Sequence, residues 1–385
     1  MIYLDYNSTT PVDPHVLKEM QPYFGDKFGN AASKSHLLGQ ESKKAVHQAR
    51  KIIAGSINAK TNEIVFTSGA TESINLGIIG TVLGSVQDRK KIITTSIEHK
   101  AVLDTCAYVR QFGVETLYLD VDANGFIDLK HLEKEIDDEV ILVVLQHVNN
   151  EIGTIEPISE AGSICSKANI PFMVDAAQSL GKLPIDVKKS NITYLAGSSH
   201  KIYGPKGVGI FYKDSMSNTK LQPMIHGGGH EGGLRSGTLN VPGIVGFGKA
   251  IELAQQNMQN EEKRLRHLAN QCVQVLKEEK IDFFVNGSED CRVAGNLNLC
   301  FIGVDADWII LHTPEIAIST GSACTSETIE PSHVLRSLGL ADENSNSSVR
   351  LSFGRFTTEE EIKKASLLLA NSVKTFLSRK EKIFG

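Results

Sequence analysis

A lysine that could act as a nucleophile lies in the segment SSHKIYGPKG, residues 198–207. Apolar runs over 192–196 and 208–212 flank this segment, and both are typical of buried strands. Burial disfavours the charged form of a lysine, and a partly neutral lysine can form a Schiff base with an aldehyde. The alternative is a solvated lysine in a hairpin turn, because Gly-Pro and Lys-Gly are ordinary turn signals. The interpretation of Lys201 therefore depends on the residues around it.

Polar residues follow several of the predicted strands at the point where each strand ends. Asp175 follows the apolar run 171–174, where a carboxylate could hold the N–H of a pyridinium ring and strengthen that ring as an electron sink. Gln178, three residues further on, could reach the phenolic oxygen of the same ring. Polar clusters also end two other strands, as QHVNNE at 146–151 and EHK at 98–100. Each residue alone is more simply a cap or a turn residue, but together they favour one site.

A phosphate site is predicted by FTSGATES at 66–73, which has the pattern of a strand, a tight glycine turn and a helix start. Backbone N–H groups at the start of a helix bind phosphate, and the hydroxyls of Ser68 and Thr71 could add donors. The alternative is an N-cap without a ligand. The motif is neither a Walker loop nor GxGxxG, so ATP and NAD are poorly supported.

A second glycine-rich stretch, HGGGHEGGLRSGT at 226–238, is too dense in glycine for a helix or a strand. Its Arg235, Ser236 and Thr238 have side chains that can contact an anion. The alternative is a flexible surface loop.

Cys324 lies in STGSACTS at 319–326, a small and polar run that predicts an exposed, mobile thiol. An incidental surface cysteine is the alternative.

Arg350 and Arg355, in VRLSFGR, are candidates for a bidentate clamp on a carboxylate, and we expect one of them to be a structural ion-pair partner instead.

The composition is that of a globular protein and indicates neither a nucleic-acid surface nor a membrane span. The 385 residues are 41% hydrophobic and 22% charged, with a net charge of −5 and a pI near 6.2. The start of the chain lacks the pattern of a signal peptide, so we expect a cytoplasmic protein. The six cysteines include no CxxC pair, and His226 and His230 are separated only by glycines, so we expect no metal site.

Strand and helix patterns alternate between about residues 14 and 215, which predicts a doubly wound α/β domain with its ligand at the carboxyl ends of the strands. Beyond Pro242 the pattern changes to a long charged helix over 251–279, short strands, and a final helix with a capping box at 358–361. We therefore predict a large domain over 14–255 and a smaller α+β domain formed by 1–13 and 256–385.

Taken together, these motifs resemble the cysteine desulfurases of the NifS/IscS type, in the class V aminotransferase group of pyridoxal-phosphate enzymes. The resemblance runs nearly end to end, through YLDYNSTTPVDP, FGNAASKSH, FTSGATES, EHKAVLDTC, HVNNEIG, VDAAQSLGKLPID, SSHKIYGPKGVG, GGGHEGGLRSGT, STGSACTSETIEPSHVLRSLG and SVRLSFGRFTTEEEI. It implies the aspartate aminotransferase-like fold, pyridoxal 5'-phosphate as cofactor and a homodimer.

The resemblance also implies a role for each matching residue. Lys201 would form the Schiff base and move the substrate's α-proton, Asp175 would hold the pyridine nitrogen, and His99 would stack on the ring and assist acid–base steps. Gln178 and Asn150 would lie near the ring oxygen. The phosphate would be bound by residues of two loops and by one residue of the second subunit, namely Ala70, Thr71, Ser198, His200 and Thr238.

For the substrate, the resemblance implies that Arg350, with Asn150, binds the carboxylate of L-cysteine. Cys324 would attack the substrate sulfur, so that alanine is released and a persulfide stays on the enzyme. The sulfur would then pass to an acceptor protein for iron–sulfur cluster assembly, tRNA thiolation or DNA phosphorothioation. Gly232 stands where the family usually has arginine, and 306–313 (ADWIILHT) replaces a commoner leucine-rich helix, so the acceptor is left open.

Two other hypotheses fit parts of the pattern. One is a pyridoxal-phosphate lyase or aminotransferase of the same fold, which would turn over without Cys324. The other is a non-catalytic scaffold, which the presence of Lys201 and Asp175 disfavours. The use of selenocysteine is left open by the sequence.

Overall fold

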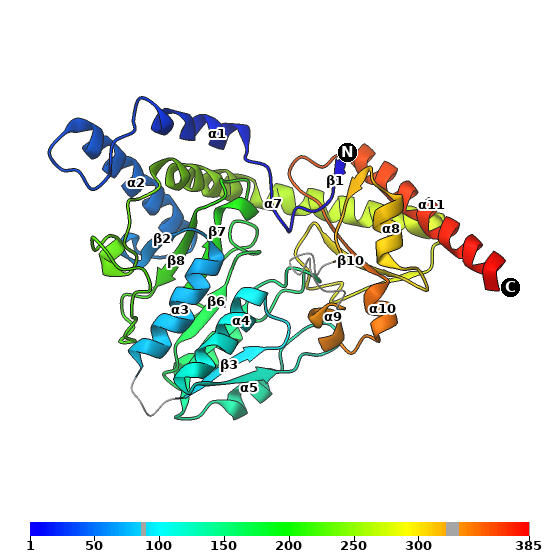
Figure 1. Cartoon of the computed structure of the whole chain (residues 1–385), viewed down its shortest axis with the longest axis horizontal. Helices are drawn as coiled ribbons and strands as arrows, with labels where there is room; N and C mark the ends of the chain where they lie inside the picture. The colour runs from blue at the N-terminus through cyan, green and yellow to red at the C-terminus, as the bar shows by residue number, and fades with distance from the viewer. Residues whose placement is uncertain (86–89, 321–330, 385) are drawn as a thin grey trace.

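The centre of the molecule is a seven-stranded sheet in the order β2-β8-β7-β6-β5-β3-β4 (Figure 1). The computed structural model describes residues 1–85, 90–320 and 331–384. Only β8 runs antiparallel to its neighbours, and the other pairs are parallel. The strands are β2 (Ile64–Thr67), β3 (Lys91–Thr95), β4 (Glu115–Leu119), β5 (Val140–Gln146), β6 (Phe172–Asp175), β7 (Tyr194–Ser198) and β8 (Gly209–Lys213).

Helices cover both faces of this sheet, as the continuous apolar runs predicted. All seven residues of β5 are buried, which is the pattern of a central parallel strand. The helices α3 (Ala70–Gly84) and α4 (Lys100–Val109) contribute to the core on one face. The core on the other face takes side chains from α1 (Pro14–Met20), α2 (Leu37–Ser56), α5 (Leu129–Glu135), α6 (Ile158–Lys167) and the first half of α7 (Val241–Glu278).

A second core forms around the C-terminal half of α7, which contributes side chains to it (Figure 1). It contains the antiparallel sheet β12-β10-β9 and the short parallel pair β1 with β11. These strands are β1 (Ile2–Tyr3), β9 (Phe283–Val285), β10 (Asn296–Phe301), β11 (Ile316–Ala317) and β12 (Ser348–Ser352). The accompanying helices are α8 (Ala306–His312), α9 (His333–Ser337), α10 (Asp342–Asn346) and α11 (Glu359–Phe384).

The capping box predicted for the last helix is confirmed, because Thr358 and Glu361 bond each other's backbone N–H groups. The predicted start of the long helix at residue 251 was wrong. The helix α7 begins at Val241, with Asn240 as its N-cap and Pro242 in the first turn, where a proline is tolerated. Since α7 is a single helix that contributes to both cores, the domain boundary near residue 255 stays a prediction.

Gly209 allows the turn after β2 to pack directly on β8. A Cβ atom at Gly209 would lie 2.6 Å from both the Gly197 carbonyl oxygen and the Gly69 Cα, and neither backbone atom can move independently. The glycine turn of the predicted phosphate site is therefore held at a position that only a glycine at 209 permits.

We expect Gly209→Ala to lower the free energy of unfolding by about 1–3 kcal/mol, the usual range for overpacking. Denaturant unfolding of the purified protein measures this change. Gly55→Ala in α2 is the matched control, because a Cβ there meets no atom within 4 Å and should leave stability equal or higher. Equal stability of Gly209→Ala and wild type would contradict the close approach.

Candidate active site

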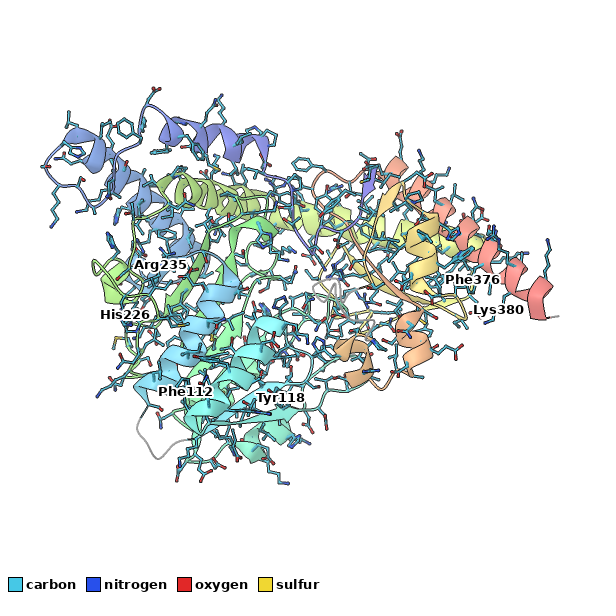
Figure 2. The ribbon with its side chains drawn as sticks, viewed as in Figure 1. Phe112, Tyr118, His226, Arg235, Phe376 and Lys380 are labelled. Carbon is cyan, nitrogen blue, oxygen red and sulfur yellow. The ribbon has the colours of Figure 1, made fainter. Side chains whose placement is uncertain are left out.

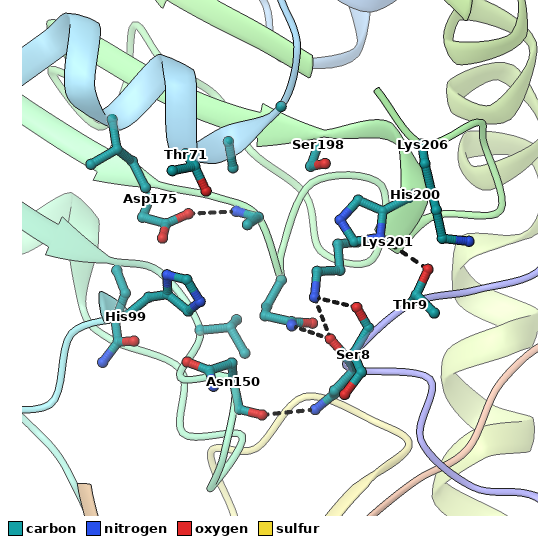
Figure 3. A pocket seen from close by; sticks show the side chains of 18 of the residues that line it. Ser8, Thr9, Thr71, His99, Asn150, Asp175, Ser198, His200, Lys201 and Lys206 are labelled. Carbon is teal, nitrogen blue, oxygen red and sulfur yellow. Dashed lines mark hydrogen bonds between the residues drawn. The ribbon is translucent and has the colours of Figure 1, made fainter. Parts of the chain in front are cut away.

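A cavity of about 580 Å³ lies where the parallel strands of the large sheet end (Figure 3). This volume is in the range of pockets that hold a cofactor. Asp175 ends β6, Ser198 ends β7, and Gln146 ends β5, so three neighbouring strands deliver polar residues to one edge. The predicted residues that line it are Ala70, Thr71, His99, Asn150, Asp175, Gln178, Ser198, His200, Lys201 and Arg350.

Lys201 lies in a short 3-10 turn, Ser199–Lys201, directly after β7. Its Nζ donates hydrogen bonds to the carbonyl oxygens of Asn7 at 2.5 Å and Ser8 at 2.8 Å. These carbonyls belong to the N-terminal segment, which passes over the cavity (Figure 3). Lys201 does lie in the connection between the antiparallel strands β7 and β8, but these hydrogen bonds show that it is not simply a solvated lysine.

Asp175 is a buried carboxylate, 6% exposed, and accepts a hydrogen bond from Ala177 N at 2.9 Å. Burial raises the pKa of Asp175, while the nearby His99 and Lys201 act in the opposite direction. An N–H donor from a ligand would stabilise the charged form of this carboxylate, as proposed for a pyridinium ring.

His99 is the N-cap of α4, and its Nδ1 accepts a hydrogen bond from Ala101 N at 3.0 Å. Burial is the main cause that lowers the pKa of His99, and Asp175 opposes it. A neutral imidazole whose Nδ1 is an acceptor carries its proton on Nε2. The helix start therefore sets the tautomer of a histidine that lines the cavity (Figure 3).

The predicted phosphate end of the cavity is formed by the start of α3 and by the loop after β7. The first N–H groups of a helix have no partner within it, so those at Ala70 and Thr71 can bind an anion. Ser68 N donates instead to Glu72 Oε2 at 2.7 Å. His200 lies 3.1 Å from Thr9 Oγ1 through its Nδ1, and burial first, then Lys201, lowers the pKa of His200 to about 4.

The glycine-rich stretch at 226–238, in which Figure 2 labels His226 and Arg235, is held by two ion pairs. Arg50 binds Glu231 through both of its terminal nitrogens, at 2.7 and 2.6 Å. Arg235 Nε donates to Glu72 Oε1 at 2.9 Å, so this arginine contacts a carboxylate of α3. Thr238 is exposed and is not among the residues that line the cavity, and its role across a dimer interface stays a prediction.

The two candidate arginines lie in different surroundings. Arg350 is 3% exposed and lines the cavity, donating to Asn150 O at 3.1 Å and to Asp5 Oδ1 and Ser8 Oγ at 2.8 Å each. Arg355 pairs with Asp13 at 2.8 Å and Glu261 at 2.5 Å, and it is absent from the residues that line this cavity.

Sequence reasoning missed the N-terminal contribution to this site. Asn7, Ser8 and Thr9 all line the cavity, and so does Lys206 (Figure 3). The polar run NSTT, at 7–10 in the motif YLDYNSTTPVDP, could have indicated that this segment lines a polar site. Cys324 lies outside the described residues.

Other kinds of site are not found in the part of the chain that the structure describes. Residues 1–85, 90–320 and 331–384 contain no group of three His, Cys, Asp or Glu side chains that could hold a metal ion. No helix among these residues is both long enough and apolar enough to cross a membrane.

The side chains of the cavity fit pyridoxal phosphate. Its lining contains a helix start and neutral hydrogen-bonding groups, and it also contains Asp175 and Lys201. Arg350 Nε is buried and has no hydrogen-bond partner among the described residues, which leaves a cationic donor for an anionic ligand. The donor set therefore matches a ligand with a phosphate, a protonated ring nitrogen and an aldehyde.

Comparison with known proteins identifies the class of enzyme. The aminotransferase class-V family model matches residues 2–365. A NifS-like protein of known structure superposes with a TM-score of 0.90 at 34% identity, over 97% of this chain and 99% of that chain. The structure of SspA in complex with cysteine superposes with a TM-score of 0.82 at 38% identity, over 93% and 100% of the two chains. The chain belongs to the aminotransferase class-V family, whose members depend on pyridoxal phosphate.

The relatives narrow the class further. The cysteine desulfurase IscS of Rickettsia bellii is 46% identical over 372 residues, which are 97% of this chain and 91% of that protein. Within the class-V family this chain is a cysteine desulfurase, and the family and fold class predicted from the sequence are confirmed.

We expect Arg350→Gln to raise the KM for cysteine by about 10- to 100-fold, because an ionic hydrogen bond contributes about 1.5–3 kcal/mol. The matched variant Arg355→Gln should leave KM nearly unchanged and lower the free energy of unfolding by about 3–5 kcal/mol, because it leaves Asp13 and Glu261 without their partner. Steady-state kinetics and denaturant unfolding measure the two effects. A larger KM effect in Arg355→Gln would assign the carboxylate clamp to Arg355.

Proposed function

We propose that this cysteine desulfurase uses Lys201 to move the α-proton of L-cysteine and Cys324 to accept its sulfur. One observation carries the first half of the proposal, namely that Lys201, Asp175, His99 and Arg350 meet in a single cavity. Pyridoxal phosphate, when bound, withdraws electrons from the substrate and makes its α-proton labile. The remaining steps are performed by the protein's own residues.

Asp175 would hold the ring nitrogen, because a buried carboxylate is stabilised by an N–H donor. His99 would lie against the ring and, as the Nε2–H tautomer, donate a proton or a hydrogen bond. Gln178 and Asn150 would bind near the phenolic oxygen. The phosphate would be held by neutral groups and helix N–H groups of Ala70, Thr71, Ser198 and His200.

Lys201 would serve both as the covalent anchor and as the base. Its Nζ lies between the carbonyl oxygens of Asn7 and Ser8, which orient the amine toward the cavity. Arg350 would bind the substrate carboxylate, with Asn150 beside it. The guanidinium already donates a hydrogen bond to Asn150 O, which keeps the arginine beside the asparagine.

Cys324 would attack the sulfur of the bound substrate, giving L-alanine and an enzyme persulfide. This role rests on the motif STGSACTS and on membership of the desulfurases. The persulfide sulfur would pass to an acceptor protein, for iron–sulfur clusters or for thiolation of a nucleic acid. We place the reaction in the cytoplasm, since a reducing compartment keeps the acceptor thiol available.

The first test is a single turnover of cysteine with wild type and Cys324→Ala, each loaded with pyridoxal phosphate. We expect the visible band of bound cofactor in both proteins, and alanine with a protein-bound persulfide only in wild type. Alanine release should fall at least 100-fold in the variant, because no other thiol replaces the nucleophile. Undiminished turnover by Cys324→Ala would instead identify a lyase of the same fold. Cys291→Ala, which removes an exposed cysteine elsewhere, is the control.

The proposed homodimer predicts complementation between two defective subunits. Thr238→Val should weaken cofactor binding by about 10-fold through loss of one hydrogen bond to the phosphate. In a mixed dimer with Lys201→Ala, the subunit that keeps Lys201 receives Thr238 from its neighbour, so one site should bind as in wild type. Co-purified, differently tagged subunits and a cofactor titration measure this. A mixed dimer no better than Thr238→Val alone would place Thr238 in its own subunit's site or in none.

A further inference from the structure

A second lysine, Lys182, lies close to Lys201 on the far side of Gln178. Its Nζ donates a hydrogen bond to Gln178 Oε1 at 3.0 Å. It is not among the residues that line the 580 Å³ cavity, whereas Gln178 is. Lys182 and Lys201 both border a separate small cavity of about 40 Å³. The hydrogen bond of Lys182 to a residue lining the 580 Å³ cavity is therefore the one to Gln178.

The contacts of Gln178 define the orientation of its amide. Gln178 Nε2 donates to Asn7 O at 2.8 Å, the same carbonyl that accepts from Lys201. A lysine ammonium is a donor only, and a carbonyl is an acceptor only. A reversed amide would place its NH₂ against the ammonium and its oxygen against the carbonyl, so both contacts would become repulsive. Lys182 and Asn7 thus favour one orientation from opposite sides.

We propose that Lys182 is a positioning residue that presents an N–H of Gln178, rather than its oxygen, to the cofactor. This rests on the proposed function, in which Gln178 lies near the ring's phenolic oxygen. The amide has two N–H groups, of which one binds Asn7 O and the other is left for the ring. An oxygen in that place would repel the ring oxygen.

The charges around Lys182 argue against a purely structural role. Burial first, and then Lys201 and Arg350, lower the pKa of Lys182 to about 7, while Glu261 acts in the opposite direction. Both carboxylate oxygens of Glu261 already bind Arg355. Since burial and the neighbouring cations disfavour the charged form of Lys182, an apolar residue of similar length should be tolerated at this position.

The test compares Lys182→Met, Lys182→Arg, Gln178→Ala and the double variant Gln178→Ala/Lys182→Met as cofactor-loaded enzymes. The dissociation constant of pyridoxal phosphate and the absorption maximum of the bound cofactor are measured for each. We expect Lys182→Met to weaken cofactor binding on the order of tenfold and to shift the band, as for loss of one ionic hydrogen bond. Lys182→Arg should restore both values, and the double variant should equal Gln178→Ala.

Unchanged affinity and absorption in Lys182→Met would overturn the proposal, and so would additive losses in the double variant. The midpoint of thermal unfolding without cofactor should not fall in Lys182→Met, whereas a structural role predicts that it does. If Lys182→Met does not fold, Lys182→Gln takes its place, and the same changes in cofactor affinity and absorption are expected. A wild-type protein without any cofactor band would refute the proposed function itself, so failure of that function can be distinguished from failure of the role proposed for Lys182.

Discussion

The site depends on the placement of one amine, Lys201 Nζ, between two backbone carbonyls of a segment that lies almost 200 residues earlier in the chain. The N-terminal segment follows the lysine turn closely. Thr10 N and Oγ1 both donate to His200 O at 3.0 and 2.9 Å, and Tyr203 N donates to Thr10 Oγ1 at 2.8 Å. Tyr203 has a φ of 66°, which is unfavourable for a side chain of this size. Asp13 N also donates to Tyr203 O at 2.9 Å, so hydrogen bonds to residues 10 and 13 hold this strained turn beside the lysine that lines the cavity.

The charges around the cavity favour an anionic ligand. The cations Lys201, Lys182 and Arg350 lie near one another, and Asp175, Asp5 and Glu261 are carboxylates that act on them. His99 and His200 are shifted toward their neutral forms by burial, so they add hydrogen-bonding groups without adding charge. A ligand that brings a phosphate, and a substrate that brings a carboxylate, supply the negative charge that the protein leaves out. Polar groups held before binding need no reorganisation when the ligand arrives.

The sheet and the residues on its strand ends were predictable because their signals are local. Each of these signals, whether an apolar run, the glycine turn at 69 or the polar residues 175 and 178, is contained in a stretch of a few consecutive residues. The contacts of Asn7 with Gln178 and Lys201 span 171 and 194 residues, and no periodicity in the sequence reports such a pairing. The early start of α7 was missed for a different reason. Its glycines signal a loop by propensity, yet Gly246 and Gly248 let the helix approach Met20 and Ala49 closely, so packing outweighs propensity.

The two arginines of β12 and the loop after it show how the N-terminal segment joins the two cores. Asp5 pairs with Arg350 and Asp13 pairs with Arg355, so the segment between them is anchored at both ends while its middle binds Lys201. The Asp13–Arg355 pair is completed by Glu261 from α7, and none of these three residues lines the cavity. Arg350 of the Asp5–Arg350 pair lines the cavity, so a substrate carboxylate bound there would share the guanidinium with Asp5. A substrate bound at Arg350, as proposed, would thereby be linked through a few residues of backbone to the carbonyls that hold the lysine amine. Arg350, which we propose binds the substrate, and Lys201, which we propose acts on it, are both contacted by the same segment, although Arg350 lies on β12 and Lys201 follows β7.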